Sequence, residues 1–152
     1  MGDINIRTLG YFIFRVLTNM IRLLNKELTR EGLGIQYPQF AIMMVLSKKE
    51  SLTQSEMTEI VDRDKAAVSR NISFLEEIGY VERRFDGGKK KRLYLSRKGK
   101  EIIPSLYRIA NQNKETVLQG FSEEEKIFVM NSLEKMFLNL NMALDEKTID
   151  EK

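Results

Sequence analysis

The stretch Ser51–Lys100 reads SLTQSEMTEIVDRDKAAVSRNISFLEEIGYVERRFDGGKKKRLYLSRKGK, and its pattern of caps, glycines and apolar residues decides the fold. Thr53 and Glu56 form the Thr-x-x-Glu pattern of a capping box, which predicts a short helix through Val61. The segment Asp62–Asp64 then predicts a turn, in which Asp64 or Asp62 can cap the next helix. Two short helices joined by a tight turn are therefore expected.

The second of these helices is expected to run to Ile78 and to stop at Gly79. Its apolar residues recur at intervals of three and four, which predicts one buried face: Val68, Ile72, Leu75 and Ile78. The first helix should bury Met57, Ile60 and Val61. Two strand-like runs follow, Tyr80–Phe85 and Lys91–Ser96, and the glycine pair between them supplies the positive φ of a tight hairpin.

This order of elements is typical of a winged helix-turn-helix, in which the second helix enters a DNA major groove and the hairpin lies beside it. A groove about 12 Å wide favours small side chains on the entering face, and Ala66, Ala67 and Ser69 meet that demand. Lys65 and Arg70 add charge to the same helix, and Arg70 is long enough to reach a guanine edge or a phosphate.

Two further groups of residues are candidates for contact with DNA. Thr53, Gln54 and Ser55 begin the preceding helix, where side chains and backbone N–H groups can donate to a phosphate. The hairpin tip, taken as Gly88 to Arg92, carries Lys89, Lys90, Lys91 and Arg92. Nine of the chain's 25 basic residues fall between Arg83 and Lys100, opposed only by Asp86, so the basic charge is concentrated around this hairpin.

Helices are expected on both sides of this segment. Leu9, Leu17, Leu24 and other apolar residues between Ile4 and Arg30 follow helical spacing, and Gly32 and Gly34 are candidates for the end of that helix. Pro38 suits the first turn of a second, buried helix. Ser51 and Leu52 should form a short extended link.

Two more helices are expected after the hairpin. Ser96 can cap a fifth helix with Ile102, Ile103, Leu106, Ile109 and Val117 inward. Ser122 and Glu125 form a second capping box, which opens a sixth helix. Some apolar residues of the first and sixth helices exceed what one core of this size covers, and they favour dimerisation: Phe12, Phe14, Leu138, Met142 and Leu144.

The composition excludes several classes of protein. The chain has 152 residues, 42% hydrophobic and 31% charged, which indicates one globular domain. It contains no Cys and no His, which excludes disulfides, Cys/His metal sites and nucleophile–His catalysis. We expect no metal, no cofactor and no enzymatic activity. Neither a signal peptide nor a membrane span is indicated, so the expected compartment is the cytoplasm.

The sequence resembles the MarR family of bacterial and archaeal regulators over nearly the whole chain. The resemblance is carried by YPQFAIMMVL (Tyr37–Leu46), SLTQSEMTEIV (Ser51–Val61), DKAAVSRNISFLEEIGYVERR (Asp64–Arg84) and RLYLSRKGKEI (Arg92–Ile102). The family pattern Leu-x-x-x-Gly-x-Val-x-Arg is met by Leu75, Gly79, Val81 and Arg83. The Asp-x-Arg usual at the wing tip is replaced by the run Lys89–Arg92 on a shorter loop, and only Arg92 carries over.

The resemblance implies a mainly α, winged helix-turn-helix, six-helix dimerising architecture in one chain, 1–152. Residues 36–100 would form the DNA-binding lobe, and 1–31 with 101–146 the dimerisation helices. It further implies a homodimer on a pseudo-palindromic operator in double-stranded DNA, acting as a repressor. Many members release DNA on binding small aromatic acids, for which Arg7 and Arg15 are candidate cations and Tyr11, Tyr37 and Phe40 candidate walls.

One alternative remains open at this stage. A winged-helix protein-interaction module has the same fold with a neutral or acidic recognition face and no salt-sensitive affinity for DNA. The basic wing argues against it, and the salt dependence of binding to random duplex separates the two.

Overall fold

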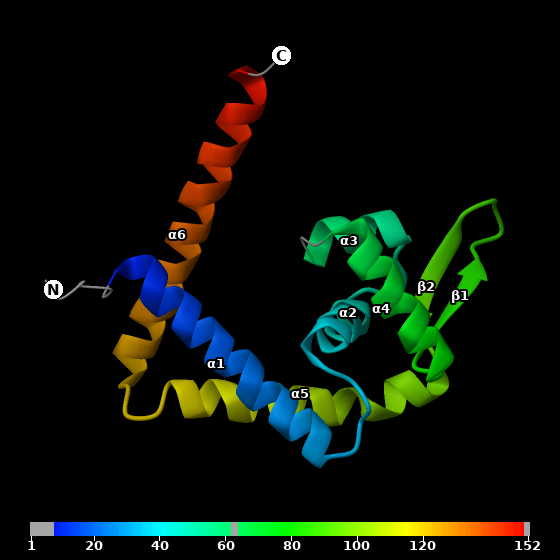
Figure 1. Ribbon diagram of the computed structural model, residues 1–152, viewed down its shortest axis with the longest axis horizontal. Coiled ribbons are helices and arrows are strands. Elements are labelled where there is room, and N and C mark those ends of the chain that lie inside the picture. Colours follow the sequence, from blue (N-terminus) through cyan, green and yellow to red (C-terminus); the bar gives the residue numbers. More distant parts are fainter. Residues whose placement is uncertain (1–7, 62–63, 151–152) are drawn as a thin grey trace, which may run out of the picture. The chain divides into compact units, whose positions relative to one another are not determined.

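The computed structural model describes residues 8–61 and 64–150, and the side chains up to residue 145 (Figure 1). The elements of the described residues follow the order α1 (Leu9–Arg30), α2 (Tyr37–Lys48), α3 (Gln54–Val61), α4 (Lys65–Glu77), β1 (Val81–Phe85), β2 (Lys91–Leu95), α5 (Arg97–Val117) and α6 (Glu123–Asp150). The chain divides into two compact units, 1–114 and 115–152. The mainly α fold with a two-stranded wing is confirmed.

Local signals in the sequence account for most of the boundaries. Gly32 follows α1 with a φ of 66°, and the Leu33 N–H donates to the Leu28 carbonyl, a left-handed helix end that favours glycine. Asp64 caps α4 by accepting from the Ala67 N–H at 2.9 Å. Ser96 caps α5 by accepting from the Gly99 N–H at 2.9 Å. The sequence predicted each of these ends. The predicted residues Ile4 to Arg7 of the first helix, and Asp62, lie outside the described residues.

The hairpin forms where the alternating pattern predicted it. β1 and β2 are antiparallel, with Val81 opposite Leu95 and Phe85 opposite Lys91. Of the two loop glycines, Gly87 has the positive φ, 82°. Leu52 forms an isolated antiparallel bridge to Leu93, so the extended link before α3 lies along the outer edge of β2. This link fixes the start of α3 against the wing.

The core belongs to the first unit. It is formed by buried side chains of α2, α4, the hairpin and α5, together with the end of α1: Leu24, Leu28, Ile35, Phe40, Ile42, Met43, Leu46, Leu52, Met57, Val68, Ile72, Leu75, Tyr80, Val81, Leu93, Leu95, Leu106 and Ile109. Gly99 is buried at the start of α5, and a Cβ there would lie 2.1 Å from the Tyr80 carbonyl oxygen. The first turn of α5 therefore packs directly on the chain that enters the wing.

Two predictions of inward residues are wrong. Ile60 is exposed, because the short helix α3 enters the core through Met57 and its last turn lies beyond the core. Val117 is exposed, because the end of α5 extends past the part of the helix that packs on the core, which ends near Asn113. Most apolar side chains of α6 and of the first half of α1 are also exposed in the single chain.

Candidate nucleic-acid interface

The first turn of α3 is built by the capping box that the sequence predicted. The Thr53 N–H donates to Glu56 Oε2 at 2.7 Å, and the Glu56 N–H donates to Thr53 Oγ1 at 3.2 Å. The Thr53 hydroxyl also donates to the Glu56 carboxylate at 3.0 Å, so it is already engaged. Ser55 is exposed and Gln54 partly exposed, and neither side chain has a hydrogen-bond partner within the described residues. Gln54 and Ser55 are the more available donors.

Glu56 is the residue that connects this turn to the wing. Hydrogen bonds from the Thr53 backbone and hydroxyl lower the pKa of the Glu56 carboxyl, and the charges of Arg92 and Lys90 lower it further. The Arg92 guanidinium lies 3.6 Å from the Glu56 carboxylate and 4.0 Å from that of Asp86. Its Nε donates to Ser51 Oγ at 2.9 Å. Arg92 therefore ties the hairpin to the start of α3.

The position of Arg92 corrects one expectation. The sequence placed it at the hairpin tip, but the loop runs from Asp86 to Lys90, and Arg92 lies in β2 opposite Arg84. Its side chain is only partly exposed, because it turns back toward Ser51. The cations at the tip are lysines.

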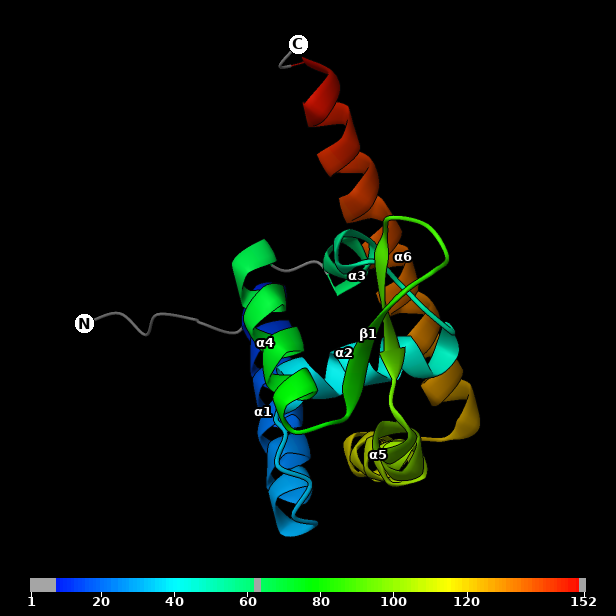
Figure 2. The ribbon, with the colours of Figure 1, turned by 90° about the vertical axis from the view of Figure 1, so that its right-hand side faces the viewer.

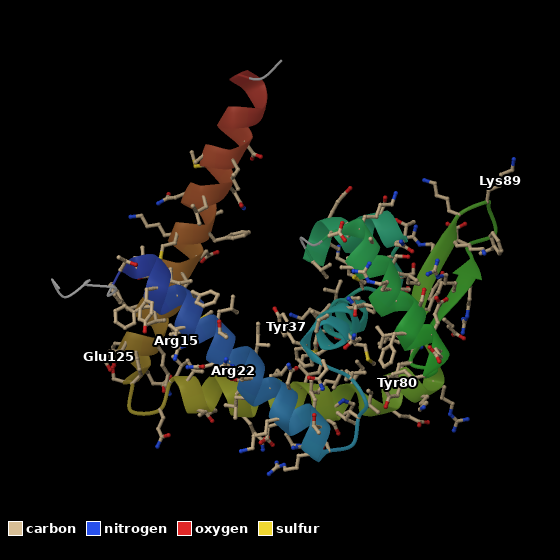
Figure 3. The ribbon with its side chains drawn as sticks, in the orientation of Figure 1. Arg15, Arg22, Tyr37, Tyr80, Lys89 and Glu125 are labelled. Carbon is tan, nitrogen blue, oxygen red and sulfur yellow. The ribbon has the colours of Figure 1, made fainter. Side chains whose placement is uncertain are left out.

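The three wing lysines, Lys89, Lys90 and Lys91, are all exposed. Figure 3 shows Lys89 projecting from the far end of the loop. Lys91 Nζ lies 5.4 Å from the centre of the Phe85 ring, a cation–π distance that keeps it at the base of the loop. On the other strand, Arg83 forms an ion pair with Glu76 of α4 at 3.0 Å, which joins the hairpin to that helix.

The outward face of α4 matches the predicted small-residue face. Lys65, Ala66 and Arg70 are exposed, and Ala67 and Ser69 are partly exposed. Only Lys65 and Arg70 among these five side chains are long. The face can therefore approach another surface closely over its first two turns, with one cation at each end.

Sequence reasoning missed the residues that hold α4 in place. Gln39 Nε2 on α2 donates to Asn71 Oδ1 at 2.6 Å, and Asn71 Nδ2 donates to the Ala67 carbonyl at 2.8 Å. An asparagine in the middle of a helix is a poor helix former, which is a weak signal that it has another role. These two bonds fix the rotation of α4 on α2 and thus the direction in which Arg70 points.

The three groups of candidates lie at one end of the first unit. In both Figure 1 and Figure 2, α3, the start of α4 and the hairpin tip lie toward the upper end of this unit, while α5 runs along the lower end. The structure thus brings backbone N–H groups of two helix starts, a narrow helix face and a lysine-rich loop to a common side. Helix starts and cations both favour phosphate groups.

A second feature, which we name the helical cavity, lies among α1, α2 and α5. Its volume is about 230 Å³ and its lining is mostly apolar: Leu17, Met20, Ile21, Leu24, Tyr37, Phe40, Ala110, Asn113 and Lys114. It includes the predicted walls Tyr37 and Phe40 but neither Tyr11 nor Arg15. Tyr11 belongs to the first turn of α1, and Figure 3 shows Arg15 nearer the start of that helix than Arg22. Arg7 lies outside the described residues.

Asn113 carries a buried acceptor at this cavity. The side chain is 6% exposed, and its Nδ2 donates to the Met20 carbonyl at 2.8 Å. Its Oδ1 has no hydrogen-bond partner among the described residues. An unpaired buried carbonyl is costly, so a donor brought into the cavity would be stabilised there.

Neither a metal-binding cluster nor a membrane-spanning helix is found in the described part of the chain. Residues 8–61 and 64–150 contain no cluster of three acidic side chains that could hold a metal ion. No helix in these ranges is long and apolar enough to cross a membrane.

The known proteins that this chain resembles are transcriptional regulators. The sequence model of the MarR family matches residues 33–92. The chain is 27% identical over 142 residues to the uncharacterised HTH-type transcriptional regulator YybA of Bacillus subtilis, covering 92% of this chain and 90% of that protein. A crystal structure of a MarR transcriptional regulator from Methanosarcina mazei is similar with a TM-score of 0.79 and 29% identity, over 86% of this chain and 87% of that one.

A further solved structure has the same fold. It is a mutant of MarR from E. coli complexed with operator DNA, with a TM-score of 0.75 and 24% identity. The alignment covers 84% of this chain and 92% of that one.

Proposed function

We propose that this chain is a DNA-binding transcriptional regulator of the MarR family, whose sequence model matches residues 33–92, and that it binds operator DNA with the face formed by α3, α4 and the wing. The observation that carries this proposal is the common location of α3, the start of α4 and the lysine-rich loop at one end of the first unit. The E. coli relative complexed with operator DNA has the same fold. This makes the protein-interaction module the less favoured reading.

The contacts divide by chemistry. Arg70 enters the major groove with Ala66, Ala67 and Ser69 and reads a base edge, with Lys65 beside the backbone. Gln54, Ser55 and their N–H groups in the first turn of α3 bind phosphate. Thr53 donates from both its N–H and its hydroxyl to Glu56 and holds that turn in place. Lys89, Lys90 and Lys91 bind phosphate from the wing, and Arg92 supports them by fixing the hairpin on Ser51.

The first experiment separates base reading from charge. Arg70→Ala should lose roughly 1–3 kcal/mol of operator binding and relax the sequence preference, since one bidentate base contact is worth about that much. Replacing Lys89, Lys90 and Lys91 with Ala should weaken binding to every duplex and flatten the salt dependence by up to about one unit of slope per contact. Lys135→Ala on α6 removes one surface charge as a control, and it should change neither the affinity for the operator nor the salt dependence of binding. Unchanged operator affinity in Arg70→Ala contradicts the assignment of this face.

We further propose a homodimer joined through the terminal helices, in the cytoplasm, on a pseudo-palindromic operator. The support is the exposed apolar surface of α6 and of the first half of α1, which a soluble monomer rarely carries at this extent. Two lobes related by twofold symmetry would meet half-sites about 34 Å apart. We propose that the bound dimer acts as a repressor, so a reporter placed behind its operator should rise when the protein is removed.

The helical cavity is the proposed site of an effector. Tyr37 and Phe40 supply apolar walls, Lys114 supplies a cation, and Asn113 Oδ1 accepts from a hydroxyl. This chemistry fits a small aromatic acid that also carries a hydroxyl group. The ligand would weaken DNA binding by favouring a lobe arrangement that does not match two successive major grooves.

A titration against operator DNA tests the effector. Salicylate should release DNA at lower concentration than benzoate, which lacks the hydroxyl, and Asn113→Leu should remove that difference. Arg15→Ala should behave as wild type, while Lys114→Ala should weaken the response to both acids. A stronger effect of Arg15→Ala than of Lys114→Ala moves the site toward the start of α1, and no response to either acid contradicts this ligand class.

A further inference from the structure

A second cavity lies on the face of the hairpin that α4 does not cover. We name it the wing-base cavity; it lies among the end of α2, the strands near Tyr94 and the first turns of α5, and its volume is about 390 Å³. The hairpin residues Arg83 and Arg84 are adjacent and therefore point to opposite faces. Arg83 forms an ion pair with Glu76 of α4, whereas Arg84 lines this cavity. The DNA-binding face proposed above uses none of its side chains.

Three cations line the wing-base cavity, one from each of its walls: Lys48, Arg84 and Lys100. Neither Lys48 nor Lys100 has an ion-pair partner among the described residues. The lining carries one carboxylate, Glu50, so its charges sum to +2. Like charges facing one cavity repel each other, and an anion bound between them would relieve that repulsion.

Arg84 is the one of the three cations with a partner. It pairs with Glu82 on the same strand, in a pair that is well exposed to solvent. Exposed pairs of this kind contribute little, so Arg84 can exchange Glu82 for a bound anion at small cost. The helical cavity, by contrast, has Lys114 as its one lining cation.

The remaining walls are apolar and aromatic. Leu46 and Leu95 are buried at the floor, and Ile103 is partly buried beside them. The Arg84 guanidinium lies 5.3 Å from the centre of the Tyr94 ring, so a cation already rests over an aromatic face at the cavity. Concave sites of about 300–1,000 Å³ with apolar walls and a few placed charges are typical of small-molecule binding.

We propose that the wing-base cavity binds a small aromatic dianion, with its charges between Lys48, Arg84 and Lys100 and its ring beside Tyr94. Aryl phosphates and aromatic dicarboxylates share this chemistry. Such a ligand would bridge α2, the wing and α5, and would therefore restrain the hairpin from the side opposite to α4. The site is separate from the helical cavity and does not depend on the effector proposed there.

Calorimetric titration of the full chain without DNA tests the proposal. The probes are phenyl phosphate and phthalate as dianions, with inorganic phosphate and benzyl alcohol as controls that carry only the charge or only the ring. Phenyl phosphate should bind more tightly than either control, and comparison with phthalate decides which dianion is preferred. Binding of benzyl alcohol as tight as that of phenyl phosphate, or no binding of either dianion at millimolar concentration, would overturn the proposal.

Matched variants locate the site. Lys48→Ala and Lys100→Ala should each weaken the dianion roughly tenfold, since one charge-assisted contact is worth about that factor. Lys49→Ala and Arg97→Ala remove the same charge from neighbouring exposed positions outside the lining and should leave affinity unchanged. Loss of binding in Lys114→Ala with full binding in Lys48→Ala would assign the dianion to the helical cavity and contradict the proposal.

Discussion

The helices α4 and α6 carry the same kind of apolar spacing and end in opposite environments. In α4, Val68, Ile72 and Leu75 are fully buried against α2 and the hairpin. In α6, Leu133 and Phe137 are 47% and 62% exposed in the single chain. Helical spacing of apolar residues therefore indicates that a face will be covered, but not whether the same chain covers it. The winged lobe buries its own apolar faces within the first unit.

The largest effect should come from charge placed on the exposed face of α6. Leu133→Asp with Phe137→Asp would remove four side chains from the symmetric interface proposed above, each worth about 1.5–3 kcal/mol of burial. The dimer should dissociate at micromolar concentration in analytical ultracentrifugation, with operator binding lost as a consequence. Asn131→Asp with Asn139→Asp adds the same two charges at positions already polar and should leave the dimer intact. A stable dimer of the first variant would show that this face of α6 is not the interface.

The matching change in the winged lobe should act on folding instead of assembly. Leu75→Ala removes a fully buried side chain from the core and should lower the free energy of unfolding by about 2–5 kcal/mol. Denaturant unfolding at several protein concentrations measures it, and the change should be the same at each. A loss that disappears as the concentration rises would place Leu75 in an interface, and the contrast between the two helices would fail.

A smaller effect is expected where α5 leaves the wing. Gly99→Ala would bring a Cβ within 2.1 Å of the Tyr80 carbonyl oxygen, and backbone is a neighbour that cannot easily move. Overpacking of this kind should lower the free energy of unfolding by roughly 1–3 kcal/mol. Gly10→Ala in α1 meets nothing within 4 Å and should be neutral or slightly stabilising. Thermal unfolding of both variants compares the lobe with the exposed part of α1, and equal stability of the two would contradict the close packing of α5.

The smallest effect concerns the ion pair between α3 and the wing. The pKa of Glu56 lies below its ordinary value of 4.5, so its carboxylate stabilises the folded lobe fully above about that pH and loses this effect as the pH falls through the lowered pKa. Glu56→Gln keeps a capping side chain but removes the charge. Urea unfolding should show that Glu56→Gln is less stable than wild type by the largest amount near neutral pH. This difference should shrink as the pH falls below 4.5. Glu59→Gln, on the same helix, should show no such gap, and a gap for Glu56→Gln that does not close in acid would mean that charge is not the cause.

Much of the winged lobe could be predicted from sequence because its determinants are local. The capping boxes at Thr53 and Ser122, the helix end at Gly32 and the hairpin loop at Gly87 each depend on residues within four positions of one another. The family motifs added the function, since the small-residue face of α4 and the basic loop are read directly from the chain.

The failures of prediction share one physical cause, which is contact between residues distant in sequence. Arg92 follows a lysine run and was expected at the tip, but Ser51 and Glu56 bind it from a segment some forty residues earlier. Ile60 has helical spacing from Met57 yet lies beyond the core that would bury it. Asn113 gave no signal at all, because the Met20 carbonyl that holds it lies on another helix.

The sequence by itself determined the order of the elements, most of their ends and the basic wing, because caps, turns and periodicity act over a few residues and do not need a folded partner. Only the tertiary structure decided which cations are free for a ligand and which are structural, since Arg83, Arg92, Lys48 and Lys100 look alike along the chain. It also separated the helix faces that one chain covers from those it leaves exposed. A charge or an apolar side chain acquires its role from the groups that packing brings within a few ångströms of it, and those groups are set by the fold as a whole.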